Sequence, residues 1–270
     1  MRCILTKSGR NKFQRGSLVN RVDREKKAYD EDDFMEYSHR WHMRFKHIFY
    51  MPNTTRIEKI FDDQIRKESK GKRVLEIGCG PGVMAANLIE NGAGYIFGMD
   101  ISEKLLSEAK KTEIKGRMEF ALGDIHERIE GTYDVIFGRA ILHHIDYRLV
   151  LTRLFKENLN PGGSMFFIEP LGANILMRLY FKIAPKAHTP DEKPFFQEDL
   201  NWFQKTFSNF QLVPINYLSL PLGILSSLIF SRPDNLLTRI GDRADVWIAE
   251  KLKVLTPRFR AALFIIKKSP

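Results

Sequence analysis

The feature that most constrains the fold is a short apolar run that passes into a glycine-rich turn. Val74-Leu75-Glu76-Ile77 is followed at once by Gly78-Cys79-Gly80-Pro81-Gly82, and an apolar helical segment begins at Val83. Glycine adopts positive φ readily, and without a Cβ it lets the backbone approach a ligand closely. A strand that enters such a turn and continues as a helix predicts a ligand site in a βαβ unit.

Strand and helix patterns alternate after this turn. The pattern predicts strands at residues 73–77, 95–99, 118–122, 133–137, 164–168, 212–218 and 260–267. Helices are expected between them, at residues 83–91, 102–111, 147–158, 174–183 and 197–207. Strands spaced by helices are typical of a doubly wound, mostly parallel sheet. The predicted fold class is therefore α/β with a seven-stranded, Rossmann-like sheet.

Length and charge suggest how the 270 residues are divided. Residues 1–27 hold nine Lys or Arg against two acids, and so carry seven of the ten net positive charges. We expect a basic, flexible arm there, because termini are often poorly ordered. Residues 28–70 mix aromatic and charged side chains at helical spacing, which predicts a helical lid. Residues 71–270 would form the main domain, with residues 219–258 as a helical insertion.

Two further observations concern the compartment. Cys3 and Cys79 cannot form a disulfide framework and lack zinc-ligand spacing, so a reduced, cytoplasmic protein is expected. Residues 206–231 carry no charge, but Pro214 and Pro221 interrupt the run of about 20 apolar residues that a spanning helix needs. We expect a strand and a short apolar helix there, which roof an acceptor pocket or touch a bilayer surface.

Two acidic residues indicate what the glycine turn binds. Glu76 lies two residues before the first glycine, where a carboxylate would repel a pyrophosphate and suit an ammonium group. Asp100, at the end of the second strand, could accept hydrogen bonds from two ribose hydroxyls. The spacing Gly-x-Gly-x-Gly also differs from the Gly-x-Gly-x-x-Gly of dinucleotide sites.

Four motifs together resemble the class I S-adenosylmethionine-dependent methyltransferases. They are residues 76–82, Asp100, the pair Gly123-Asp124, and Leu159-Asn160-Pro161-Gly162-Gly163, and the resemblance covers about residues 72–169. It implies the Rossmann-like methyltransferase fold, an enzyme that transfers methyl groups, and S-adenosyl-L-methionine as cofactor.

The resemblance also implies roles for particular residues. The three glycines would cradle the methionine end of the cofactor, Glu76 would lie near its amino group, and Asp100 would hold the ribose. Asp124 with Ile125 would contact the adenine. The predicted cofactor-binding set is Glu76, Gly78, Cys79, Gly80, Gly82, Asp100, Ile101, Asp124, Ile125 and Arg139.

Candidate catalytic residues follow the fourth and fifth strands, where the crevice of a doubly wound sheet opens. They are His143, His144 and Glu169, each of which could remove a proton from the acceptor. Structural roles are the alternative: Glu169 could cap or salt-bridge a loop, and the histidines could hold their own loop in place. We expect no metal, because no Asp/Glu/His cluster with metal-ligand character is evident beside the predicted methyl site.

Several classes of methyl acceptor are disfavoured because the chain lacks the motifs of the enzymes that use them. The chain lacks the Asp/Asn-Pro-Pro-aromatic motif of nucleic-acid amino methyltransferases, the Pro-Cys of cytosine-C5 enzymes and the Asp-Asn pair of metal-dependent catechol enzymes. Residues 169–194 resemble a bacterial subgroup that acts on small or lipid-like molecules. We expect O- or C-methylation of a small, hydrophobic or lipid-like acceptor, no nucleic-acid partner, and weak peripheral membrane contact. The alternatives are an RNA-modifying enzyme that uses the basic arm and a non-catalytic cofactor-binding protein.

Overall fold

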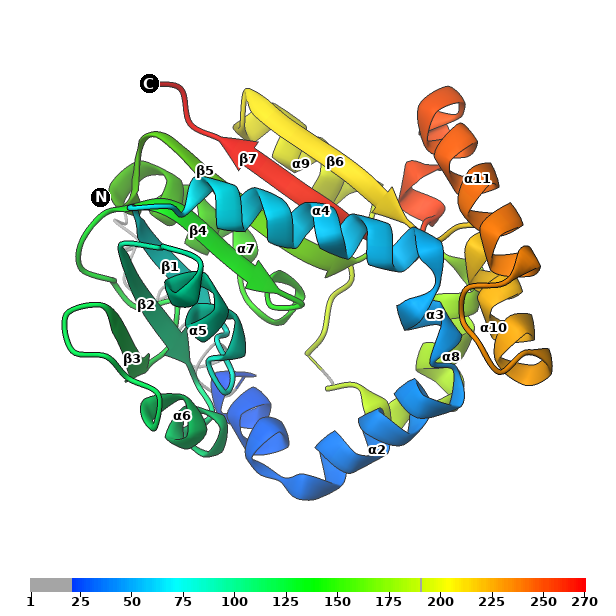
Figure 1. The fold of residues 1–270 in the computed structure, drawn as a ribbon, viewed down its shortest axis with the longest axis horizontal. Helices are drawn as coiled ribbons and strands as arrows, with labels where there is room; N and C mark the ends of the chain where they lie inside the picture. The colour runs from blue at the N-terminus through cyan, green and yellow to red at the C-terminus, as the bar shows by residue number, and fades with distance from the viewer. Residues whose placement is uncertain (1–20, 190) are drawn as a thin grey trace, which may run out of the picture.

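The computed structural model (Figure 1) describes residues 21–189 and 191–270, without the side chains of residues 32–35. Seven strands form one sheet in the order β3-β2-β1-β4-β5-β7-β6. Their bounds are β1 Arg73–Ile77, β2 Tyr95–Asp100, β3 Met118–Leu122, β4 Tyr133–Arg139, β5 Leu159–Pro170, β6 Asn209–Ile215 and β7 Ala261–Lys267. This confirms the predicted doubly wound, mostly parallel sheet.

The strand order reverses direction at β1, which determines where a ligand can bind. β1 pairs in parallel with β2 on one side and with β4 on the other, whereas β7 runs antiparallel to β5 and β6. In an open α/β sheet, ligands bind outside the carboxyl ends of the strands at such a switch point. The end of β1, where the glycine turn begins, is therefore the expected site.

Helices cover both faces of the sheet. The α-helices of the described chain are residues 21–30, α2 Asp32–Arg44, α3 His47–Tyr50, α4 Pro52–Glu68, α5 Val83–Glu90, α6 Glu103–Lys110, α7 Tyr147–Arg153, α8 Ile175–Ile183, α9 Gln197–Thr206, α10 Ser219–Ile229 and α11 Leu236–Lys251. Helix 21–30 and α2 lie beyond the carboxyl ends of the parallel strands (Figure 1).

Alternation along the strands builds two cores. Because successive side chains point to opposite faces, Phe166 packs with Phe61 of α4 and Leu88 of α5, whereas Phe167 packs with Leu151 of α7 and Phe203 of α9. Figure 1 shows α4 and α5 in front of the sheet and α7 and α9 behind it. The sheet is thus buried on both faces, and a ligand can reach it at the carboxyl ends of its parallel strands.

The predicted bounds of several elements agree with the structure where glycine or a capping side chain marks the end of the element. The bounds of β1 and β3 are those predicted, and the Ser102 hydroxyl caps α6 by accepting from the Leu105 N–H. The turn expected at residues 160–163 instead lies inside β5, as an irregularity between the pairs Tyr133–Leu159 and Val135–Ser164.

The uncharged segment at 206–231 forms β6 and α10, as expected. α10 packs against α3 and α11 and adds no residue to the cavity described below. Within the two described ranges, no helix is both long and apolar enough to cross a bilayer.

The predicted basic arm needs correction at its boundary. Residues 21–27 belong to helix 21–30, and Glu25 in it is buried. The helix is held because its charged side chains have partners elsewhere in the chain. Residues 1–20, with most of the arm's positive charge, lie outside the described residues.

Candidate active site

A cavity opens at the end of β1, and the glycine turn forms part of its wall. Gly78, Gly80 and Gly82 all have positive φ, at 68°, 52° and 75°. A Cβ on Gly82 would lie 2.7 Å from the ring of Phe120, so packing excludes a side chain there. A Cβ on Gly80 would meet no atom within 4 Å, because Gly80 lines the cavity. Gly80 thus leaves room for a ligand, whereas Gly82 keeps the turn close to the sheet.

Asp100, at the end of β2, is fixed against this turn. Its Oδ2 accepts from the Gly80 N–H at 2.7 Å, and its Oδ1 accepts from the Ser102 N–H at 2.9 Å. Burial raises the pKa of Asp100, although the backbone hydrogen bonds oppose that shift. Each carboxylate oxygen has a further lone pair. The carboxylate can therefore accept from a ligand hydroxyl without losing its present partners.

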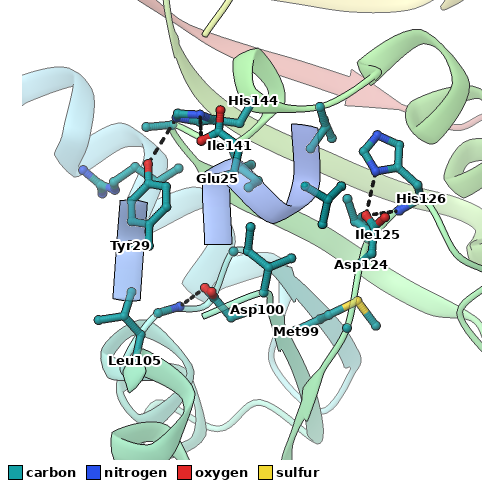
Figure 2. Close-up of a pocket in the computed structure, with 18 residues that line it drawn as sticks. Glu25, Tyr29, Met99, Asp100, Leu105, Asp124, Ile125, His126, Ile141 and His144 are labelled. Carbon is teal, nitrogen blue, oxygen red and sulfur yellow. Dashed lines mark hydrogen bonds and ion pairs between the residues drawn. The ribbon is translucent and has the colours of Figure 1, made fainter. Parts of the chain in front are cut away.

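Asp124 and His126 form a second polar corner of the cavity (Figure 2). Asp124 Oδ1 accepts from the His126 N–H at 2.9 Å and lies 2.6 Å from His126 Nδ1. The Asp146 N–H donates to His126 Nε2 at 3.0 Å, which places the ring proton on Nδ1. Burial works to raise the pKa of Asp124, but the hydrogen bonds from His126 outweigh it and the pKa is lowered.

Helix 21–30 supplies the opposite wall, through Val22, Glu25 and Tyr29. Glu25 Oε2 lies 2.9 Å from His144 Nδ1 without the alignment of a hydrogen bond, and Glu25 Oε1 accepts from the Thr189 hydroxyl at 2.5 Å. Tyr29 Oη lies 3.2 Å from His144 Nε2, and Figure 2 marks this contact with a dashed line. Both nitrogens of the His144 ring therefore face residues of this helix.

Further contacts attach helix 21–30 to both sides of the cleft. Arg24 donates to both carboxylate oxygens of Asp191, at 2.7 and 2.8 Å. On the other side, Lys26 pairs with Glu103 of α6 at 2.5 Å, and Asp30 accepts from the Ser102 hydroxyl at 2.6 Å. The helix is consequently held across the cleft at several points.

Glu169 lies behind the cavity wall and organises the loop after β4. It is fully buried, and its Oε1 accepts from the backbone N–H groups of Ile141 and Leu142 at 3.0 and 2.9 Å. Its Oε2 lies 2.7 Å from His143 Nδ1 and 3.4 Å from the His143 N. Burial, and then the neighbouring His144, lower the pKa of His143. This geometry favours a positioning role for Glu169.

Glu76 is buried and incompletely bonded. Its Oε2 is shielded from solvent and has no hydrogen-bond partner within the described chain. Burial, followed by the nearby charge of Asp100, raises the pKa of Glu76 to about 8. An orphaned carboxylate oxygen is costly to bury, and a cationic ligand group would satisfy it.

Comparison with known proteins supports the interpretation of this geometry. A family model described as "Methyltransferase domain" matches residues 35–205, well over half of the chain. The chain belongs to the class I S-adenosylmethionine-dependent methyltransferases.

Individual curated relatives match a smaller part of this methyltransferase than the family model does. A curated "Ubiquinone biosynthesis O-methyltransferase" of Aliivibrio fischeri is 30% identical over 140 residues, which cover 47% of this chain and 58% of that protein. The chain thus matches little more than half the length of this relative.

Two solved structures share the fold with this methyltransferase. One is phosphoethanolamine N-methyltransferase 2 of Haemonchus contortus in complex with S-adenosyl-L-methionine, with a TM-score of 0.56, 18% identity, and coverage of 84% of this chain and 56% of that one. The other is magnesium protoporphyrin IX methyltransferase of Synechocystis PCC 6803 with bound SAH, with a TM-score of 0.56, 14% identity, and coverage of 92% and 100%. At these identities the likeness concerns the fold alone.

The structure brings most of the predicted residues of the methyltransferase to one cavity. Those that line it are Gly78, Gly80, Asp100, Ile101, Asp124, Ile125, Arg139 and His144. Glu76, Cys79, Gly82, His143 and Glu169 are not among the lining residues. Arg139 reaches the edge of the cavity, but its guanidinium pairs with Glu58 and Asp62 of α4 at 3.0 and 3.4 Å. The cofactor and catalytic roles of all these residues stay predictions.

The sequence pattern did not indicate part of the cavity wall. The residues not predicted are Val22, Glu25, Tyr29, Met99, Leu105, Gly123, His126, Ala140, Ile141 and Ile145, although Gly123 belongs to a motif already noted. Val22, Glu25 and Tyr29 follow one another at spacings of three and four, which places them on one side of a helix. That spacing was the available indication that residues 21–30 pack against something.

The expectation that no metal-compatible cluster lies beside the site is wrong. His143, His144 and Glu192 each offer a ligand atom, and these atoms lie within 4.8 Å of one another. All three side chains already contact other residues: His143 contacts Glu169, His144 contacts Tyr29, and Glu192 contacts His188 and the Thr189 N–H. A cation would have to compete with these contacts.

The cluster gives a direct test of the prediction that methyl transfer needs no metal. We expect methyl transfer to persist in EDTA, because protein partners already hold the three candidate ligands. The measurement is turnover before and after chelation, with magnesium or zinc added back. Complete loss in EDTA with recovery on adding either metal would contradict the prediction and make this cluster the candidate site of a required cation.

Proposed function

We propose that this methyltransferase binds S-adenosyl-L-methionine in the cavity at the end of β1 and transfers its methyl group to a small, hydrophobic or lipid-like acceptor. The observation that carries the proposal is the unpartnered Glu76 oxygen, on the strand that runs into the glycine turn, together with the open space at Gly80. The cofactor has an ammonium group that would satisfy this oxygen. It also has ribose hydroxyls that would donate to Asp100.

The remaining assignments follow the same logic. Gly78, Gly80 and Gly82, with Cys79 between them, would surround the methionine end. Asp124 with Ile125 would contact the adenine, and Ile101 would pack beside the ribose. Arg139 would contribute mainly through its hold on α4, because its charge is already paired with Glu58 and Asp62.

Among the three catalytic candidates, His144 is best placed to meet an acceptor. It lines the cavity, whereas His143 and Glu169 lie behind it. The bound cofactor supplies an electrophilic methyl group on a sulfonium, so the chain's task is to orient the acceptor and take up its proton. In this scheme His144 takes up the proton at Nε2, where the acceptor replaces Tyr29, while Glu25 orients the ring from the Nδ1 side and Glu169 positions the loop that carries it.

The acceptor class is supported by two observations. Curated relatives are named ubiquinone biosynthesis O-methyltransferases, which makes an oxygen on a small lipid-like molecule the preferred acceptor. In the predicted lid, Trp41 also stacks on Phe45 and Phe49 stacks on His42, which gives this segment an aromatic, apolar character. The basic residues of the RNA-modifying alternative lie largely in residues 1–20, outside the described chain.

The experiment that tests the function is an acceptor screen. Purified protein and methyl-labelled S-adenosyl-L-methionine are incubated with apolar phenols, isoprenoid catechols, fatty acids and tRNA, and products are identified by mass spectrometry. We expect label in an apolar hydroxylated acceptor, and loss of turnover with retained cofactor binding in His144→Asn. Labelled tRNA alone would contradict the acceptor class. Tight binding of S-adenosylhomocysteine without any turnover would favour a non-catalytic protein.

The raised pKa of Glu76 gives a further prediction. At pH 7 the unliganded protein holds Glu76 protonated, because its pKa is about 8. An ammonium group requires the ionised form, so cofactor binding should release up to about one proton at this pH. Calorimetry in buffers of different ionisation enthalpy measures that release, and Glu76→Gln should abolish it. Equal proton release in both proteins would rule out Glu76 as the group responsible.

The same shift affects stability. A glutamate in the unfolded chain has an ordinary pKa of 4.5, whereas Glu76 in the folded protein has a pKa of about 8. Between these values the folded state retains a proton that the unfolded chain has lost, so the contribution of this group to the free energy of unfolding falls as pH rises through that window. Saturating cofactor should remove much of this loss, and urea titrations at several pH values would show whether it does.

A further inference from the structure

α8 presents an apolar stripe to the outside of the molecule. Ile175, Leu179 and Ile183 are spaced by four residues, so they lie along one side of the helix. Their exposed fractions are 79%, 51% and 55%, and no residue of α8 is buried. Side chains of this size are rarely exposed in a continuous row unless the row contacts something.

A neighbouring side of α8 is anchored. Leu176 and Met177 pack against a small core made by Ile48 of α3, by Met51 directly after α3 and by Leu220 of α10. This packing fixes the rotation of α8 about its own axis. The exposed stripe is therefore a defined surface of the fold.

α10, in the same cluster, exposes a second group of apolar side chains. Leu225, Leu228 and Ile229 lie at spacings of three and four along the helix, and Phe230 follows it. Their exposed fractions are 43%, 69%, 61% and 41%. Leu220 and Ile224 of α10 pack in the core that also holds α8, so the two exposed groups belong to one three-helix cluster.

The chain segment that carries the α8 stripe has charges of a single sign. Residues 171–189 contain no aspartate or glutamate, while Arg178, Lys182 and Lys186 recur every four residues and are exposed. On a helical projection, Arg178 and Lys182 lie next to the apolar stripe and away from the anchored side. Long basic side chains at the border of an apolar stripe suit an anionic lipid surface, because they reach the headgroups while the stripe enters the acyl boundary.

We propose that the exposed sides of α8 and α10 dock on the surface of an anionic bilayer. No helix of the described chain can span a membrane, so the contact lies in the plane of the interface. A second copy of the chain fits less well, because two such faces would bring the same cations together without acidic partners on α8. The link to catalysis rests on the proposed function, since a lipid-like acceptor would be met at such a surface.

The test measures binding of the full-length protein to vesicles without cofactor or acceptor. With vesicles containing about 30% phosphatidylglycerol, Leu179→Glu and Lys182→Glu should each weaken binding about tenfold. The matched controls are Leu149→Glu on α7, where the leucine is 54% exposed, and Lys110→Glu at the end of α6. α6 lies at the opposite end of the molecule from α8 (Figure 1). Both controls should stay within about twofold of wild type.

Residues 1–20 are present in every variant, so their contribution cancels in the comparison. Equal losses in the α8 variants and the controls would overturn the proposal, as would binding of wild type to pure phosphatidylcholine that equals binding to the anionic vesicles. A wild-type dimer that Leu179→Glu dissociates, detected by light scattering, would assign the face to a second copy instead. Because no turnover is involved, these outcomes leave the proposed methyl transfer untouched.

Discussion

Gly80→Val is expected to abolish binding of S-adenosyl-L-methionine. Gly80 lines the cavity, and a Cβ at this position would meet no protein atom within 4 Å, so the two methyl groups of valine would occupy the ligand's space. The positive φ of 52° adds backbone strain for a β-branched residue. Calorimetry should show no measurable heat of binding, which corresponds to a loss of at least about a thousandfold in affinity.

Gly116→Val is the matched control for strain. Gly116 also has a positive φ, at 74°, and a Cβ there would also meet nothing within 4 Å, but Gly116 does not line the cavity. Both variants should lose comparable stability in urea, and only Gly80→Val should lose the cofactor. Near-native affinity in Gly80→Val would place the cofactor elsewhere and remove the basis of the proposed site.

Glu169→Gln is expected to destabilise the fold by about 2–4 kcal/mol, because it turns one acceptor oxygen into a donor amide inside a ring of N–H groups. The backbone donors at Ile141 and Leu142 and the ring of His143 all converge on this carboxylate. Ile141 and His144 line the cavity, so cofactor affinity should fall together with stability. Urea unfolding and calorimetry measure the two effects.

Asp245→Asn provides the comparison for Glu169→Gln. Asp245 is likewise buried and accepts from the backbone of Tyr217, Leu218 and Ser219, but it lies outside the cavity. It should lose stability and keep cofactor affinity. If Glu169→Gln instead keeps both stability and affinity and loses only turnover, then Glu169 is the catalytic base and the positioning role is wrong.

The sequence predicted those parts of the molecule that local chemistry determines. The glycine turn, the strand before it and the acid at the end of β2 lie where expected, because apolar strand patterns and turn glycines act over a few residues. The order of motifs along the chain is by itself typical of the family. The start of β5 differs from the prediction, because residues 160–163 are part of the strand and do not form a separate turn before it.

The wall formed by helix 21–30 could not be predicted in the same way. Its charged residues are typical of a solvated segment, and Glu25 is buried only because His144 and Thr189 lie beside it in the fold. Those partners are more than a hundred residues away in sequence. The role of Glu169 has the same origin: a carboxylate after a strand suits either a base or an anchor, and only its four contacts around residues 141–143 favour the anchor.

The clamped helix 21–30 has a kinetic consequence. Its ties to Asp191 and Glu103 are partly exposed ion pairs, which dissolved salt weakens. In the proposed site a spent cofactor lies beneath the helix, and if it leaves past the helix these ties must open first. Product release then sets the pace of steady-state turnover where opening is slower than the transfer step. In that case the first turnover is faster than the steady-state rate, and a moderate rise in ionic strength should increase the steady-state rate. At higher salt the cleft should open so readily that it no longer retains the incoming cofactor.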